Sequence, residues 1–512
     1  MAGRFFAALC AAAIFATPAL AQKSKDTMRL AIQEPIKGVD YYLAPTGDTS
    51  MQQAVVYDSL IAYDEDANKF TPLLAKSWKR IDERTLEFTM RDDVTWHDGQ
   101  KFSADDAVYT INWLIDPATK LRFKEFWSWI DKVEKTGPAT VRVIAKQPTA
   151  FDESRMAYLT AILPEHVHAK LEDKIAFGRA PVGTGMYKAV QVDENKGTLL
   201  EQNPNYTFGG SARPVTNVKR INLAFIPDQG TQMAQFLAGN LDVLRDVDVA
   251  QAEHLAAMPN TAMTLVEGIS WTYIAFDAKG RSGVKPLQDE RVRKAIAMGI
   301  DRVELKSLLL GSHAISKDPK ALCWDFQAGC AYTVPLPPFD PAAAKKLLAD
   351  AGYPNGFDLE ITTFITPAVK RLAEAAANQL SKIGIRTTVD SQTLVSYGKK
   401  QTDGKIQAII ASYPAGLMPD VSGTASFLFS EGARDYSGDD TIHQLALDVQ
   451  TTVDPAKRKE IGRKLFDEAT EKAYALPLTA NPLFFVHTSD VKIATGGSFT
   501  GFGIDMWDLN WK

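Results

Sequence analysis

The chain has 512 residues, of which 45% are hydrophobic and 23% are charged, and its formal net charge at pH 7 is −5. These proportions are typical of a folded soluble protein, and the length allows two or three domains with separate cores. The negative balance argues against nucleic acid and against an anionic membrane surface as partners.

Residues 1–21 have the pattern of a secretory signal peptide. Arg4 supplies a short positive region, residues 5–16 are apolar, and the run Ala-Leu-Ala at 19–21 matches a small-x-small cleavage site. No later segment approaches the roughly 18 apolar residues of a membrane span. The sequence therefore predicts export to the periplasm, with cleavage after Ala21.

The run of residues 94–109, VTWHDGQKFSADDAVY, predicts a strand, a tight turn and the start of a helix. Gly99 after Asp98 suits the turn, because glycine tolerates a positive φ. Ser103 with Asp106 three residues later predicts a capping box in which a short Asp side chain replaces the usual Glu. The charged groups stand where a helix cap needs them, so a structural function is favoured over catalysis.

Gly183-Thr184-Gly185 leads into a predicted strand at 186–192. A phosphate-binding loop needs the N-terminus of a helix after its glycines, and this segment lacks one. We expect a chain crossing or a hinge here.

Two parts of the chain alternate predicted strands with helices. The first comprises 220–225, 229–238 and 241–243, and the second comprises 357–364, 368–382, 385–390 and 406–411. Alternation of this kind predicts an α/β fold with mainly parallel sheets. No fixed-period repeat or Pro/Gly/Ser-rich linker separates the two parts, which favours domains interleaved by several crossings of the chain.

Three further helix boundaries are marked by particular residues. Asp289 is placed to cap a helix, and Asp340 with Pro341 is placed to start another one, since Pro suits the first helical position. Gly352 is expected to end that second helix.

Cys323 and Cys330 are the cysteines that remain after cleavage of the predicted signal peptide, which contains Cys10. An even number in an oxidising compartment predicts a disulfide bond. The short loop limits its stabilisation to roughly 2–3 kcal/mol. The spacing does not fit a zinc site or a redox motif.

Several motifs along the chain resemble, in the same order, those of the extracytoplasmic solute-binding proteins of family 5, the peptide-, dipeptide- and nickel-binding components of ABC importers. They are VYDSL at 56–60, PLLAKSW at 72–78, the run at 94–109, PVGTGMY at 181–187, NPNY at 203–206, LAGNLD at 237–242 and LQDERVRKA at 287–295.

The resemblance implies an α/β, two-lobed periplasmic-binding-protein fold of type II with an extra inserted α+β domain. The first lobe would comprise 22–52, 184–270 and 483–512. The inserted domain would comprise 53–183, and the second lobe 271–482.

Ligands of open α/β sheets bind beyond the carboxyl ends of the strands. The predicted ligand-binding residues come from three sources. They are the strand ends that this rule selects, the aromatic strand between the lobes, and a loop that often contacts ligand in the family. The residues are Tyr41, Thr46, Gly47, Asp48, Trp271, Tyr273, Phe364, Thr366, Ser412, Tyr413 and Ala415. For Trp271 and Tyr273 the alternative is that both rings fill a core.

The loop after Tyr413 departs from the peptide-binding members of the family. These carry Trp-x-x-Asp, whose Asp holds the peptide amine, and this chain has Ser412 at the Trp and Ala415 at the Asp. Asp48 and Asp420 are the candidates for a substitute amine ligand.

The resemblance implies a monomeric carrier, without cofactor, metal or catalysis, that captures a di- or oligopeptide or a peptide-like solute and delivers it to a membrane permease. A non-peptide ligand such as an opine, an oligosaccharide or a nickel chelate is the alternative. His166-x-His168 is interpreted as an ordinary surface pair, because no further metal ligand accompanies it. A secreted hydrolase is the rival from another class, and its common motifs are missing from the sequence.

Overall fold

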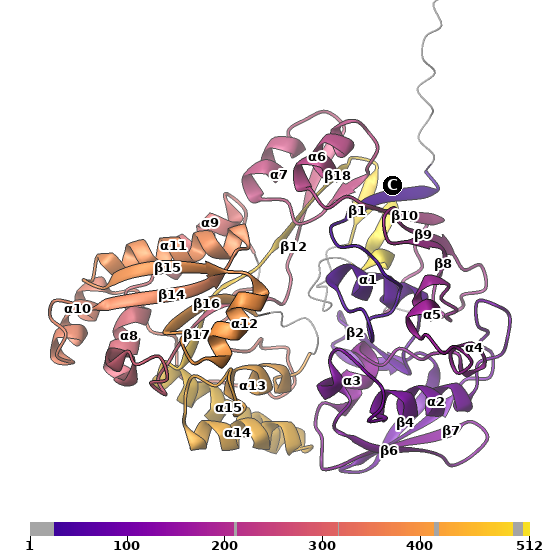
Figure 1. Ribbon diagram of the computed structural model, residues 1–512, viewed down its shortest axis with the longest axis horizontal. Coiled ribbons are helices and arrows are strands. Elements are labelled where there is room, and N and C mark those ends of the chain that lie inside the picture. Colours follow the sequence, from indigo (N-terminus) through magenta and orange to yellow (C-terminus); the bar gives the residue numbers. More distant parts are fainter. Residues whose placement is uncertain (1–24, 209–211, 316, 414–418, 495–504) are drawn as a thin grey trace, which may run out of the picture.

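Three β-sheets build the framework of the protein in the computed structural model, which describes residues 25–208, 212–315, 317–413, 419–494 and 505–512. Figure 1 shows two bodies side by side. The second lobe contains the five-stranded sheet, and the other body combines the seven-stranded sheet of the first lobe with the four-stranded sheet of an inserted domain. The predicted signal peptide lies outside the described residues.

The sheet of the first lobe draws on distant parts of the chain, in the order β12-β18-β11-β1-β10-β9-β8. β1 and β10 are parallel and pair Thr27 with Arg220. The strands are β1 (Thr27–Ile32), β8 (Tyr187–Asp193), β9 (Gly197–Gln202), β10 (Arg220–Phe225), β11 (Val243–Leu244), β12 (Thr261–Val266) and β18 (Leu483–Thr488). Its helices are α1 (Gly47–Val56), α6 (Gln229–Leu237) and α7 (Val249–Ala256).

The sheet of the second lobe has the order β15-β14-β16-β13-β17. Its strands are β13 (Trp271–Phe276), β14 (Asp358–Phe364), β15 (Arg386–Gln392), β16 (Ala408–Tyr413) and β17 (Ala475–Ala480). Alternate side chains of β13 enter two cores, with Tyr273 in one and Ile274 in the other, because neighbouring strand residues point to opposite faces.

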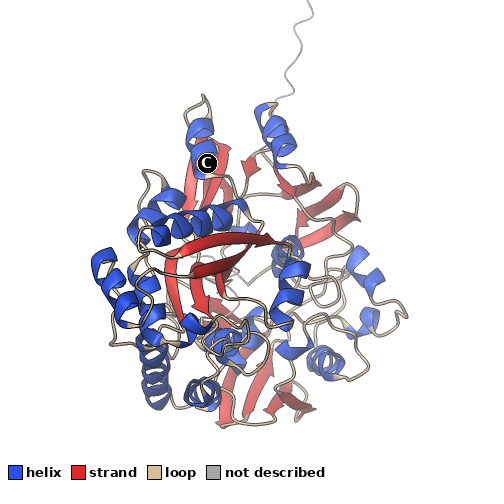
Figure 2. Ribbon diagram, turned by 60° about the vertical axis from the view of Figure 1, so that its left-hand side comes forward, coloured by secondary structure: helices blue, strands red, loops and turns tan. Residues whose placement is uncertain are grey.

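Helices lie around the outside of the strands (Figure 2). Those of the second lobe are η2 (Lys285–Gln288), α8 (Glu290–Met298), α9 (Arg302–Leu310), α10 (Pro341–Asp350), α11 (Pro367–Ser381), α12 (Leu394–Thr402), α13 (Ser422–Phe429), α14 (Asp440–Thr451) and α15 (Pro455–Glu471).

The expectation of mainly parallel sheets is wrong. β14 is parallel to β15 and β16, but β13 is antiparallel to both of its neighbours, β16 and β17. β13 follows β12 of the first lobe and β17 precedes β18 of the same lobe, so one strand enters the second lobe where the other leaves it. Two strands that carry the chain in and out side by side must run in opposite directions.

The four-stranded sheet of the inserted domain is antiparallel, with the order β4-β5-β7-β6. The elements of this domain are β2 (Ile61–Asp64), β3 (Lys69–Pro72), β4 (Ala75–Asp82), β5 (Thr85–Met90), α2 (Ala104–Ile115), η1 (Lys124–Phe126), β6 (Ile130–Lys135), β7 (Thr140–Ala145), α3 (Asp152–Tyr158), α4 (Glu165–His168) and α5 (Ile175–Arg179). Phe88 and Trp96 belong to the same core as Leu223 of the first lobe, so the two are fused. Close to the C-terminus are β19 (Val491–Ile493), η4 (Met506–Asp508) and β20 (Leu509–Trp511).

The predicted helix caps and the predicted turn are confirmed. Ser103 and Asp106 form the capping box of α2, and Gly99 has a φ of +89°. Asp289 caps α8, and Asp340 caps α10 with Pro341 in its first turn. These features depend on residues that are neighbours in sequence, which is why the pattern predicts them.

Gly183-Thr184-Gly185 packs against the C-terminal end of α1. A Cβ on Gly183 would lie 1.8 Å from the carbonyl oxygen of Val56, so no other residue fits there without a shift of backbone. The Thr184 hydroxyl donates to Asp58 Oδ2 at 2.9 Å. The segment is therefore a tightly packed crossing, as predicted, and β8 follows it rather than a helix.

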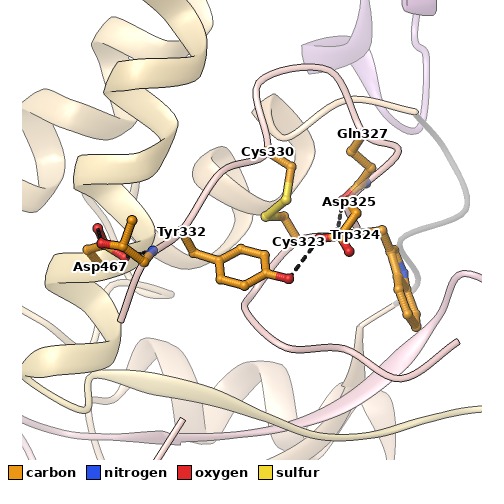
Figure 3. The surroundings of a disulfide bond; sticks show 8 residues. Cys323, Trp324, Asp325, Gln327, Cys330, Tyr332 and Asp467 are labelled. Carbon is orange, nitrogen blue, oxygen red and sulfur yellow. Dashed lines mark hydrogen bonds between the residues drawn. A yellow bond between two sulfur atoms is a disulfide. The ribbon is translucent and has the colours of Figure 1, made fainter. Parts of the chain in front are cut away.

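The predicted disulfide bond between Cys323 and Cys330 is confirmed, with the two Cα atoms 5.9 Å apart. Both cysteines are buried in the second lobe (Figure 3). Within the bridged loop, the indole N–H of Trp324 donates to the carbonyl of Ile269 at 2.6 Å. Beyond it, the Tyr332 hydroxyl donates to Asp325 Oδ1 at 2.8 Å. The bridge thus closes a short loop, and the hydrogen bond of Trp324 ties this loop to the segment just before β13.

Candidate functional site

A cavity of about 640 Å³ lies between the inserted domain and the second lobe. One wall comes from the segment with η1 and α3, and the other from the end of β16, α13 and α14. Figure 1 shows α3 facing α13 across the boundary of the two bodies. At one edge the walls touch, since the N–H of Ala150 donates to the carbonyl of Gln450 at 2.9 Å. A volume of this size suits a small organic ligand.

Aromatic rings from both walls line this interlobe cavity: Phe123, Phe126, Trp129, Phe151, Tyr413 and Phe427. Tyr413 ends β16 and is 6% exposed, with its ring centroid 4.6 Å from Trp271 and 5.0 Å from Phe427. Burial raises the pKa of Tyr413 to about 12, so its hydroxyl is protonated at neutral pH. Stiff rings with one polar tip are well suited to a binding wall.

Positive charge exceeds negative charge along the lining, where Lys146, Arg155 and Arg434 stand against Glu125. The guanidinium carbon of Arg155 lies 4.6 Å from the ring centroid of Phe126 and 5.4 Å from that of Phe151. Burial lowers the pKa of Arg155 to about 10, and the group stays charged at neutral pH.

Tyr413 is the predicted ligand-binding residue that lines the interlobe cavity. Trp271 is 0% exposed and Tyr273 is 2% exposed, and both rings belong to the core of the second lobe. Both rings therefore lie in a core, which is the alternative to ligand binding that the sequence left open. Trp271 still supports the site, because its ring packs directly behind that of Tyr413.

The other predicted residues of the second lobe lie apart from Tyr413's cavity. Phe364 packs its ring on Tyr397 at 4.7 Å between centroids, and Thr366 is the exposed residue before α11. Ser412 Oγ accepts from Asn481 Nδ2 at 2.6 Å. Ala415 lies outside the described residues.

The predicted residues of the first lobe line two other cavities. Tyr41 lines one of about 410 Å³, and its ring centroid is 6.3 Å from Phe123 of the interlobe cavity. Gly47 and Asp48 line one of about 280 Å³, and Thr46 caps α1 through its side chain. The structure thus divides four of the predicted residues among three cavities, and the other described ones line none of these cavities.

Neither candidate for a substitute amine ligand is free. Asp48 is ion-paired with Arg245, and its second oxygen accepts from the N–H of Gln33 at 3.0 Å. Asp420 is buried and forms a two-pronged pair with Arg458, whose Nη1 lies 2.7 Å from Asp420 Oδ2. Each carboxylate is thus already paired with an arginine, and amine binding by either aspartate stays a prediction.

Sequence reasoning missed most of the lining, above all Arg155 on α3 and Arg434 before α14. A single arginine within an ordinary helix carries no pattern that separates a cavity wall from a solvated surface. Phe427 on α13 is equally inconspicuous, because an aromatic residue in a helix most often belongs to a core.

The two histidines of His166-x-His168 each have a separate partner. His166 Nε2 lies 2.7 Å from Asp98 Oδ2, and the buried His168 Nδ1 lies 2.6 Å from the hydroxyl of Tyr109. Over the described ranges, no group of three or more His, Cys, Asp or Glu side chains is arranged for a metal ion. In the same ranges, no helix combines the length and the apolar character that crossing a bilayer requires.

Two lobes with an interleaved chain and an interlobe cavity define a periplasmic-binding-protein fold of type II with an inserted domain. Residues 69–435 match the family described as bacterial extracellular solute-binding proteins, family 5 Middle. The chain therefore belongs to this family, whose members are extracytoplasmic components of ABC importers.

Relatives resemble the chain over most of its length, and a solved structure shares its fold. Heme-binding protein A of Haemophilus influenzae is 26% identical over 402 residues, which cover 73% of this chain and 70% of that protein. Glutathione-binding protein GsiB of Salmonella typhi is 25% identical over 98% of this chain and 97% of its own. The dipeptide-binding protein of a Pseudoalteromonas species, in complex with Met-Leu, has a TM-score of 0.77 at 20% identity and covers 95% of this chain and 100% of that one.

Proposed function

We propose that the protein captures a peptide or peptide-like organic solute in the interlobe cavity and delivers it to an ABC permease. The observation that carries this proposal is the cavity of about 640 Å³ with aromatic walls from two separate bodies of the fold. Relatives named for glutathione, for heme and for a dipeptide are consistent with a solute of this size.

Binding would act through a domain equilibrium. A solute held by Phe151 of one wall and Tyr413 of the other stabilises the closed arrangement of the lobes, because it contacts both. The permease then recognises the closed form. We infer the lobe boundaries given by the resemblance, a monomeric state and no chemical conversion of the solute.

Export belongs to the same proposal. Cleavage after Ala21 would release the mature chain into the periplasm, where the bond between Cys323 and Cys330 forms. Mass spectrometry of the secreted protein should give a chain that begins at Gln22 and lacks two hydrogens relative to the fully reduced form.

Native mass spectrometry of the protein expressed in a periplasm tests the proposal. We expect a mass above that of the polypeptide, which denaturation releases as an unmodified peptide or peptide-like solute. Release of a porphyrin, an opine or a sugar would show that the ligand is of another class, while the carrier function would still hold. Products of turnover from the released solute would contradict a carrier function altogether.

A further inference from the structure

Arg155 is a cation of the cavity wall that forms no ion pair with any residue the structure describes. None of the residues that the structure describes pairs its guanidinium with a carboxylate, and its buried Nε has no hydrogen-bond acceptor there. The contacts of its side chain are instead the rings of Phe126 and Phe151. The nearby carboxylate of Asp420 is already neutralised by Arg458, and Glu125, an exposed residue of the lining, makes no ion pair with it.

Arg434 repeats this arrangement on the opposite wall. Its guanidinium carbon lies 5.1 Å from the ring centroid of Phe427, and no described acid pairs with it. The two arginines thus approach the cavity from the inserted domain and from the second lobe, each supported by an aromatic ring. Other arginines of the protein, such as Arg458 and Arg245, are paired with aspartates.

An unpaired charge that is partly removed from water is unfavourable, and folds rarely retain one unless a ligand completes it. A guanidinium presents several N–H donors in a fixed fork that matches a carboxylate. An aromatic ring against its face leaves these donors free along the edge of the plane. A carboxylate of a solute in the cavity would therefore supply the ion-pair partner that Arg155 lacks among the described residues.

We propose that the solute carries at least one carboxylate, which Arg155 binds, with Arg434 on the facing wall as a second anion contact. This inference rests on the proposed function and narrows it to acidic organic solutes. The rings of Phe126, Phe151 and Phe427 then accommodate an apolar or flat part of the same molecule.

Matched acid and ester pairs test the inference by calorimetric titration. The probes are glutathione and its diethyl ester, hemin and its dimethyl ester, and Met-Leu and its C-terminal amide. The proteins are the wild type, Arg155→Gln, Arg155→Lys and Arg434→Gln. Arg386→Gln serves as the matched control, because Arg386 is exposed and pairs with Asp358 far from the cavity.

We expect an acid that binds the wild type to bind at least tenfold more tightly than its neutralised partner. Arg155→Gln should weaken the acid by about 10- to 100-fold and abolish the preference, since a charge-assisted bond is lost. Arg155→Lys should retain part of the affinity, Arg434→Gln should lose less than Arg155→Gln, and Arg386→Gln should bind like the wild type. The thermal midpoint of each variant shows whether it is folded.

Two results would overturn the inference and leave the proposed carrier function intact. One is equal binding of an acid and its neutralised partner, and the other is a co-purified solute without an acidic group. Unchanged affinity of the folded Arg155→Gln protein would also overturn it. If Arg155→Gln does not fold, the inference is tested by the affinity of Arg155→Lys and by the ratio of the affinities of the wild type for each acid and its neutralised partner. If nothing co-purifies and no probe binds, the proposed function fails and the inference falls with it.

Discussion

Two polar regions of the inserted domain differ in how completely their groups are paired. At the junction with the first lobe, His97 Nδ1 accepts from the N–H of Gly183 at 3.1 Å and its Nε2 lies 3.0 Å from the carbonyl of Gly185. Asp58 accepts from Thr184 in the same place. At the interlobe cavity, Arg155 Nε has no hydrogen-bond acceptor among the described residues. Hydrogen bonds of this kind are typical of a structural joint, whereas an unpaired cation in the wall of a cavity is a candidate ligand contact.

The largest expected effect concerns a fully paired group of the second lobe, which shows what the loss of a partner costs. Asp420→Asn should lower the free energy of unfolding by about 3–5 kcal/mol, because Arg458 would remain as a buried charge without its carboxylate. Urea denaturation measures the change. If the Asp420→Asn protein were as stable as the wild type but no longer bound solute, Asp420 would be a ligand-binding residue rather than a structural one.

Gly183→Ala tests how tightly the joint between the inserted domain and the first lobe packs against α1. A Cβ at 1.8 Å from the Val56 carbonyl oxygen forces the backbone apart, and we expect a loss of about 3 kcal/mol. Gly398→Ala in α12 is the matched control, since a Cβ there meets nothing within 4 Å. It should be neutral or stabilise by about 0.5–1 kcal/mol. Equal effects at both glycines would show that the crossing is not tightly packed.

The pH dependence of stability tests whether the joint requires a neutral imidazole. Burial lowers the pKa of His97 to about 4. The unfolded chain therefore takes up a proton at about pH 6.5 that the folded chain refuses until about pH 4, so the contribution of His97 to stability is lost as the pH falls through this window. The loss at His97 should reach about 1–3 kcal/mol.

His97→Gln isolates this contribution from that of other titrating groups. The variant should be less stable than the wild type at pH 7, because the hydrogen bonds to Gly183 and Gly185 change. Its free energy of unfolding, measured in urea at pH 7 and pH 4.5, should fall less between the two values than that of the wild type. Parallel pH profiles would contradict a depressed pKa of His97.

The smallest effect on stability is expected at the wall of the cavity. Tyr413→Phe keeps the ring against Trp271 and removes a hydroxyl, so the free energy of unfolding should change by less than about 1 kcal/mol while solute affinity falls. Tyr413→Ala is a poorer probe of binding, because the ring is 6% exposed and its removal leaves a void that also destabilises the fold. An unchanged solute affinity of Tyr413→Phe would show that this hydroxyl does not contact the ligand.

The sequence by itself determined the features that arise between near neighbours. The cap of Ser103 and Asp106, the turn at Gly99, the bond between Cys323 and Cys330 and the strand at 220–225 all appear as predicted. The family also followed from ordered motifs, and residues 69–435 match it. Local chemistry suffices for these features, because the interacting groups lie within a few residues or recur in a fixed order.

The tertiary structure alone decided which polar groups are paired and which face a cavity. Asp48 meets Arg245 and Asp420 meets Arg458 only after distant segments have come together, and each acid then has a cation as its partner. Arg155 became a candidate for the opposite reason, since folding places it against aromatic rings and no residue that the structure describes forms an ion pair with it. Charge compensation depends on long-range packing, and no spacing along the chain encodes it.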